Sequence, residues 1–248
     1  MKILEWNVKC AAGCKKYGRK NLKSLFETKP DCDVLVLTEF YRLEDYKDFL
    51  KQLEEWGYNC FITELKEKCN DVFIAVSNKY NATLVKNRKV EEDFSDIPNF
   101  LAVSLKIIDI EFAIVGVRFF GEPNHKKSQF IQFLSLINNF KKVVVCGDFN
   151  NEKIRGKENV IYSEEQIDII YAKYRQFEYN YHRIKLWFEQ NKFFLITPAE
   201  RVSYKYEKPY KGGSKIDHFA VKGVRISNVI YLETNKSDHN QLLGEIEF

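Results

Sequence analysis

Polar residues capable of chemistry stand at the ends of several apolar runs in this sequence. They are Asn7, Glu39, Asp148, Asn150, Asp217, His218, Asp238 and His239. Open α/β sheets place their ligand sites at strand ends, so residues of these types at such positions can share one site. Any one of them alone is more typical of a turn or of a strand end that reaches solvent. Their joint occurrence favours a functional site.

The oxygen donors in this set predict a divalent cation. Asn7, Glu39 and Asp238 offer hard oxygen atoms, which suit Mg²⁺ or Mn²⁺ rather than Zn²⁺. Three such donors leave room for the water ligands that Mg²⁺ retains. An ion held there would neutralise the charge that develops on a phosphoryl group and its leaving oxygen during in-line displacement. We therefore expect phosphoryl chemistry with Mg²⁺ or Mn²⁺ as the cofactor.

The remaining residues of the set favour hydrolysis. Asp148 and Asn150 can hold an attacking water molecule. His239 with Asp217 gives an imidazole that a carboxylate holds in one tautomer. Acyl transfer is not indicated, because the sequence contains no Gly-x-Ser-x-Gly elbow and no Cys beside a His.

The composition is that of a globular protein of 248 residues, of which 45% are apolar and 30% are charged. This composition is too apolar for a disordered chain, and 11 glycines and 5 prolines are too few for a fibrous protein. We expect a single domain over 1–248 and a monomer. The 39 Lys and Arg against 35 Asp and Glu give a net charge of +4, which permits a polyanionic partner without requiring one.

The sequence shows no targeting signal, and together with its cysteine usage this predicts a cytoplasmic protein without a membrane span. No secretory signal is expected at the start of the chain, since Lys2 and Glu5 interrupt its apolar residues. No apolar stretch reaches the roughly 18 residues that a span needs. The six cysteines form no Cys-x-x-Cys pair, which favours reduced, structural thiols.

Hydrophobic periodicity predicts a layered α/β domain. Near-continuous apolar runs, typical of strands buried on both faces, lie at 3–8, 33–38, 72–77, 100–106, 111–118, 143–146, 216–221 and 242–248. Helical spacing of apolar residues is found at 19–28, 43–56, 126–140 and 164–191. Strands and helices alternate over 1–60 and again over 111–190, and an antiparallel meander is expected over 72–118.

Five short strings resemble the motifs of one family, in that family's order and over nearly the whole chain. They are Leu-Glu-Trp-Asn-Val at 4–8, Leu-Thr-Glu at 37–39, Val-Cys-Gly-Asp-Phe-Asn at 145–150, Lys-Ile-Asp-His-Phe at 215–219 and Ser-Asp-His at 237–239. The chain thus resembles the endonuclease/exonuclease/phosphatase superfamily, the deoxyribonuclease-I-like fold. This resemblance implies a four-layer α/β sandwich, two packed mixed β-sheets flanked by helices, with a divalent-metal site at one end.

The resemblance also implies a role for each residue. Glu39 would be the main metal ligand, with Asn7 and Asp238 nearby. Asp148 and Asn150 would position or deprotonate the attacking water. Asp217 would orient His239. Whether Asp148 or His239 accepts the proton stays open at this point.

One position departs from the family's pattern. At the end of the 111–118 strand the family commonly has His or Tyr, whereas this chain has Arg118. A guanidinium can clamp a phosphate with two hydrogen bonds but cannot donate a proton at neutral pH. His125 could take over that role if the 119–124 loop folds back, although a solvated loop histidine is the favoured interpretation. The basic and aromatic stretch 204–215 is either a solvated turn or a nucleic-acid contact.

These observations together predict an enzyme. We expect a cytoplasmic, Mg²⁺-dependent phosphodiesterase that uses direct water attack, with a nuclease acting on DNA rather than RNA as the leading interpretation. A phosphatase acting on a small phosphorylated molecule or a lipid head group is the alternative within enzymes. A catalytically weak relative that binds nucleic acid or a protein partner is the third interpretation. The complete set of polar residues argues against it, and the substitution at Arg118 argues for it.

Overall fold

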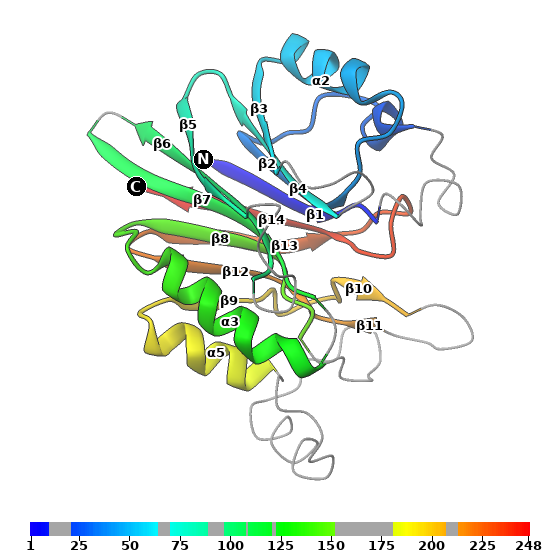
Figure 1. The fold of residues 1–248 in the computed structure, drawn as a ribbon. Helices are drawn as coiled ribbons and strands as arrows, with labels where there is room; N and C mark the ends of the chain where they lie inside the picture. Colours follow the sequence, from blue (N-terminus) through cyan, green and yellow to red (C-terminus); the bar gives the residue numbers. More distant parts are fainter. Residues whose placement is uncertain are drawn as a thin grey trace.

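The computed structural model describes residues 1–9, 21–63, 70–88, 97–107, 109–120, 123–151, 181–206 and 213–248, with the backbone alone at 123–127 and 182–183. Two six-stranded sheets pack face to face in this part of the chain, and helices cover their outer faces (Figure 1). The architecture is the four-layer α/β sandwich that the sequence predicts.

The first sheet has the strand order β13-β14-β1-β2-β4-β3. Its strands are β1 Lys2–Asn7, β2 Val34–Phe40, β3 Tyr58–Ile62, β4 Asp71–Ser77, β13 Arg225–Leu232 and β14 Gln241–Glu247. β1 and β2 run parallel, and the other pairs of this sheet are antiparallel.

The second sheet has the strand order β5-β6-β7-β8-β12-β9. Its strands are β5 Asn81–Asn87, β6 Asn99–Ile107, β7 Ile110–Arg118, β8 Val143–Asp148, β9 Phe194–Ile196 and β12 Asp217–Lys222. β7 and β8 run parallel, and the remaining pairs are antiparallel. The meander expected over 72–118 is therefore divided, because β4 pairs within the first sheet and β5, β6 and β7 form a meander in the second.

The helices are η1 Leu22–Leu25, α2 Tyr46–Glu55, α3 Pro123–Ile137 and α5 Tyr181–Gln190. α2 lies on the outer face of the first sheet, and α3 and α5 lie on the outer face of the second (Figure 1). None of the helices in the described residues is long and apolar enough to cross a membrane. A short hairpin of β10 Tyr204–Lys205 and β11 Gly213–Ser214 stands beside the sandwich.

The helix predicted at 19–28 is wrong within its described part. Residues 22–25 form a single 3-10 turn, and Phe26 is already extended. The Asn21 side chain caps this turn at the Ser24 N–H, and the Asp45 carboxylate accepts the N–H groups of Leu22 and Lys23. These side-chain acceptors replace the carbonyls of a longer helix. Of the helix predicted at 164–191, residues 164–180 lie outside the described part of the chain.

The main core lies between the two sheets. Val36 and Ile74 of the first sheet pack against Leu101 and Ile114 of the second, all fully buried. Burying an aliphatic side chain of this size contributes about 1.5–3 kcal/mol, so this layer fixes the two sheets relative to each other. Because the sheets are fixed, side chains at the same end of each sheet keep a constant separation.

Candidate active site

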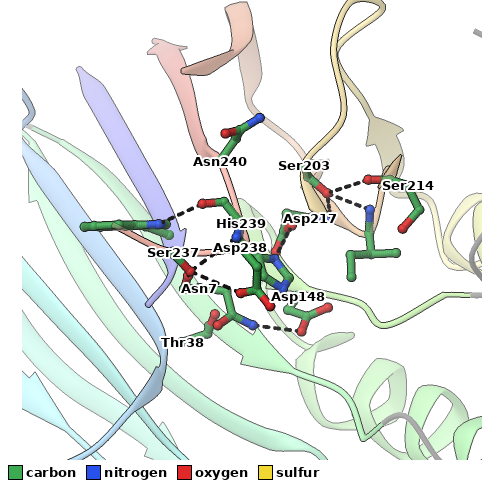
Figure 2. Close-up of polar contacts among 12 residues, drawn as sticks. Asn7, Thr38, Asp148, Ser203, Ser214, Asp217, Ser237, Asp238, His239 and Asn240 are labelled. Carbon is green, nitrogen blue, oxygen red and sulfur yellow. Dashed lines mark hydrogen bonds and ion pairs between the residues drawn. The ribbon is translucent and has the colours of Figure 1, made fainter. Parts of the chain in front are cut away.

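Both parallel strand pairs end on the same side of the sandwich. Asn7 ends β1 beside Thr38 of β2, and Asp148 ends β8 beside Arg118 of β7. Asp217 begins the antiparallel strand β12 directly opposite Asp148. Figure 2 shows the Asn7, Asp148 and Asp217 side chains close together, although they come from two different sheets. The predicted site residues therefore meet at one end of the fold.

Three hydrogen bonds fix the carboxylate of Asp148. The Asn7 side-chain amide donates to Oδ2 at 3.0 Å, and the Asn150 side-chain amide donates to the same oxygen at 2.8 Å. The Asn150 backbone N–H donates to Oδ1 at 2.8 Å. Asn150 has a φ of +46°, a left-handed conformation that Asn tolerates better than most residues. This turn lets one asparagine contact both oxygens of Asp148.

Burial is the main influence on the titration of Asp148, which is 1% exposed. Burial and the neighbouring Asp217 carboxylate raise the pKa of Asp148 to about 7, and this rise outweighs the opposite effect of His239 and Arg118. Desolvation and a nearby like charge both disfavour the charged form of a carboxyl group, so both raise its pKa. Asp148 therefore combines fixed geometry with a pKa near neutrality.

Gly147 is required for the position of Asp148. It has a φ of +149°, and a Cβ at this residue would lie 1.8 Å from the Val117 carbonyl oxygen of β7. Glycine alone permits this close approach of the two strands. The glycine of the Gly-Asp-Phe-Asn string thus has a steric role in the site.

Asp217 and His239 form a buried pair. The Nδ1 atom of His239 donates to Oδ2 of Asp217 at 2.8 Å, and the two residues are 5% and 0% exposed. Burial alone would lower the pKa of His239, but the charge and hydrogen bond of Asp217, with help from Asp148 and Asp238, raise it to about 9. With Nδ1 bonded to Asp217, Nε2 is the nitrogen that can face a substrate.

Glu39 lies in a distorted part of β2. Its φ is +50°, and the register with β4 shifts between Leu37 and Phe40. A bulge of this kind turns a side chain away from its regular direction. The Arg118 guanidinium donates to Oε1 of Glu39 from Nε at 3.0 Å and from Nη2 at 2.9 Å. Burial would raise the pKa of Glu39, but Arg118 above all holds it below its usual value.

Asp238 is held at the end of β1. The Lys9 ammonium forms an ion pair with its Oδ2 atom, and Asp238 is 4% exposed. The neighbouring Ser237 hydroxyl donates to the Asn7 carbonyl oxygen at 2.8 Å, which ties this segment to β1. The Asn7 side chain is also near enough to Glu39 to help lower the pKa of that carboxyl. Asn7 thus lies between the two carboxylates that were predicted to bind a metal.

The donor chemistry of these residues fits Mg²⁺ or Mn²⁺. Glu39, Asp238 and Asn7 supply two carboxylates and one amide, all of them hard oxygen donors. Within the described part of the chain, no three or more His, Cys, Asp and Glu residues are grouped so that they could hold a metal. The set named here differs from such a group because one of its three donors is an amide. An ion bound here would keep several water ligands, as Mg²⁺ commonly does. Arg118 and Lys9 now neutralise the two carboxylates and would have to move from them.

Several residues of the site were not found from the sequence. The Ser203 hydroxyl accepts the backbone N–H groups of Ile216 at 2.8 Å and Asp217 at 3.0 Å, and so fixes the start of β12 (Figure 2). Glu5, two residues before Asn7 in β1, is fully buried and accepts a hydrogen bond from the Thr38 hydroxyl at 3.2 Å. Burial, together with Asp217 and Asp148, raises the pKa of Glu5 well above its usual value. The period of two along β1 was a signal that Glu5 shares the inner face with Asn7.

His218 does not join the site. Its Nδ1 atom is 2.8 Å from the Thr197 hydroxyl, and its Nε2 atom is 2.9 Å from Oδ1 of Asn151. Burial lowers the pKa of His218 to about 3, so the ring is neutral and structural. His125 lies in the first turn of α3 rather than in a loop, and its side chain is outside the described atoms.

The described cysteines Cys32, Cys60 and Cys146 are free thiols. Burial raises the pKa of all three, to about 12 for Cys32 and for Cys60. Such thiols are unreactive, as a structural interpretation requires. The other three cysteines lie outside the described residues.

No family model and no curated protein sequence matches the chain. Solved structures match it over nearly its full length. The 3′ phosphatase NExo from Neisseria, bound to product DNA hairpin, is 18% identical with a TM-score of 0.63, and the match covers 100% of both chains. ANGEL2, a 2′,3′-cyclic phosphatase, is 15% identical with a TM-score of 0.63, and the match covers 99% of this chain and 94% of that one. The chain has the fold of the endonuclease/exonuclease/phosphatase superfamily.

The superfamily fold alone does not decide the activity. A Cimex nitrophorin in its ferrous NO complex is 12% identical with a TM-score of 0.55, and the match covers 99% of this chain and 96% of that one. A nitrophorin and two phosphatases thus share this fold with the chain, so function has to be argued from the side chains of the site.

Proposed function

We propose that this protein is a divalent-metal-dependent phosphoric ester hydrolase that cleaves a phosphodiester of DNA by direct attack of water. The observation that carries the proposal is the meeting of two fixed acid–base groups, Asp148 and the Asp217–His239 pair, at one end of the sandwich. Hydrolysis needs groups that orient a water molecule and receive its proton, and both are fixed here by hydrogen bonds. The likeness to NExo bound to DNA supports the choice of substrate.

Each residue has a part in the proposed reaction. Asp148, held by Asn7 and Asn150, orients the attacking water. Asp217 keeps the imidazole of His239 in the orientation that leaves Nε2 to meet the water or a phosphoryl oxygen. In this proposal Asp148 accepts the proton of the water, because the raised pKa of His239 leaves its ring protonated at neutral pH and able only to donate.

The charge on the phosphate is neutralised by cations in this proposal. Asn7, Glu39 and Asp238 would hold Mg²⁺ or Mn²⁺, which when bound supplies positive charge to the phosphoryl oxygens. Arg118, 14% exposed at its side chain, lies at the same strand ends. Its guanidinium would move from Glu39 to the non-bridging oxygens, where it can form two parallel hydrogen bonds.

Hydrolysis of a substrate panel tests this function. Plasmid DNA, single-stranded DNA, RNA, an abasic duplex and inositol phosphates would be incubated with the protein in Mg²⁺, in Mn²⁺ and in EDTA. We expect metal-dependent cleavage of DNA that Glu39→Gln abolishes. Glu111→Gln, which alters an exposed residue bonded to Ser104, is the matched control and should cleave normally. Turnover of inositol phosphates alone would indicate the phosphatase alternative, and no turnover of any substrate would contradict a hydrolase.

A further inference from the structure

The hairpin β10–β11 is tied directly to the catalytic pair. Tyr204 forms an isolated antiparallel bridge with His239, and the Lys205 backbone N–H donates to the Asp238 carbonyl oxygen at 2.8 Å. Ser203, directly before the hairpin, accepts the N–H of Asp217. The backbone on both sides of the Asp217–His239 pair is therefore bonded to this one segment, which fixes its position beside the site.

The hairpin places two aromatic rings at the catalytic histidine. The Tyr204 ring packs edge-on against the His239 ring, with 5.1 Å between centroids. The Tyr206 ring packs edge-on against Tyr204 at 5.9 Å, and both tyrosines are half-buried. Gly213 permits this arrangement, since a Cβ there would lie 2.1 Å from the Tyr204 carbonyl oxygen. Tyr204 contacts His239 and Tyr206 extends the aromatic surface from Tyr204, so these half-buried rings can present their remaining surface to a bound substrate.

The described lysines of this segment are bound to backbone carbonyls. Lys205 donates through its ammonium group to the Thr234 carbonyl oxygen, and Lys215 donates to the carbonyl oxygens of Pro198 and Ala199 at 3.0 and 2.7 Å. Lys208 and Lys211 lie outside the described residues. Because the ammonium groups of Lys205 and Lys215 serve the scaffold, the surface that these residues offer a substrate is aromatic more than basic.

We propose that Tyr204 and Tyr206 form a stacking subsite for an unpaired nucleobase beside the scissile phosphate, so that the substrate is single-stranded nucleic acid. This inference rests on the proposed function and names the substrate class of the same site. A base presents a flat π face to an aromatic ring whatever its sequence, whereas a base inside a duplex is already stacked on its neighbours. An inositol ring is saturated and has no such face.

Binding of matched oligonucleotides tests the subsite without requiring turnover. Fluorescence anisotropy in EDTA would compare a short oligothymidylate with a strand of equal length in which tetrahydrofuran abasic residues replace the nucleotides. We expect the base-containing strand to bind about tenfold more tightly, the scale of one stacked base. Tyr206→Leu should bring the ratio of affinities close to one. Tyr206→Phe, which keeps the ring, should retain the ratio.

A matched control lies at the opposite end of the second sheet. Phe194 is 71% exposed and pairs with Val221 near the end of β12, so Phe194→Leu removes an exposed ring far from the site and should leave the ratio unchanged. Thermal unfolding of each variant verifies that it is folded.

Three results would overturn the subsite: equal binding of the two strands to the unmodified protein, a preference that survives Tyr206→Leu, or tighter binding of a blunt duplex of the same sequence. A preserved binding preference with no hydrolysis of any substrate in Mg²⁺ would contradict the proposed function and leave the subsite intact.

Discussion

Replacing Asp217 with Asn should lower the pKa of His239 strongly. The rise of that pKa from 6.5 to about 9 corresponds to about 3 kcal/mol in favour of the imidazolium form. Burial acts in the opposite direction, so the carboxylates around the ring, with Asp217 as the largest contributor, must supply more than this amount. Asn keeps the shape of the side chain and removes its charge. We therefore expect the His239 pKa to fall by at least about two pH units.

An NMR titration of the histidine ring protons in the metal-free protein measures this shift. The spectrum of His239→Gln assigns the signal among the four histidines of the chain. Asp33→Asn is the matched control, because Asp33 pairs with Lys79 and the Lys2 N–H at the far end of the first sheet. It should leave the His239 titration unchanged. A His239 pKa that stays near 9 in Asp217→Asn would refute the pairing as the cause.

We also expect these substitutions to lower kcat. Asp217→Asn and His239→Gln should each reduce kcat by about 10² or more, and the double variant should lose little more than either single variant. Losses that multiply would show that the two residues act separately.

Three further outcomes follow from the contacts of the site. Arg118→Lys, which loses the planar fork, should reduce kcat/KM about tenfold and Arg118→Ala about a hundredfold, and normal steady-state kinetics in both variants would remove Arg118 from the site. His218 has a pKa of about 3 when folded against 6.5 when unfolded, so the folded state binds fewer protons between these values. Its contribution to stability is complete above pH 6.5 and is lost as the pH falls, by about 2 kcal/mol at pH 5. Urea unfolding of His218→Gln should lack this pH dependence, and an equal dependence in both proteins would contradict it. Ser203→Ala leaves two buried N–H groups without their acceptor and should lower the free energy of unfolding by about 2–4 kcal/mol, whereas a loss below about 0.5 kcal/mol in the same assay would mean that water replaces the hydroxyl.

The strands found from the sequence are the interior strands of the two sheets. Seven of them are buried on both faces along most of their length, which gives near-continuous apolar runs: β1, β2 and β4 of the first sheet and β6, β7, β8 and β12 of the second. In β14, the eighth, buried and half-buried residues alternate. The edge strands β3, β5, β9 and β13 were missed. β5 shows why, because most of its Asn-Ala-Thr-Leu-Val-Lys-Asn residues are exposed. Its apolar residues need not form a recognisable run.

The sequence predicted which residues belong to the candidate site better than it predicted the contacts between them. Asn7, Asp148 and Asp217 could be placed because each adjoins an apolar run and carries a side chain with evident chemistry. Ser203 could not, since its partners lie 13 and 14 residues away and no local pattern marks a serine that accepts two backbone N–H groups. The ion pair of Arg118 with Glu39 depends on the register of two different sheets. The roles of these residues, the metal, the monomeric state, the single domain and the cytoplasmic location stay predictions.

The most direct test of the central claim is the rate of DNA hydrolysis in Mg²⁺ by Asp148→Asn, purified in parallel with the unmodified protein. Asn keeps the size of the side chain but cannot accept a proton or carry the charge that orients the water. We predict a fall in the hydrolysis rate of at least about a hundredfold with an unchanged thermal unfolding curve. Equal rates for the two proteins would contradict the assignment of this site as the place of phosphodiester hydrolysis.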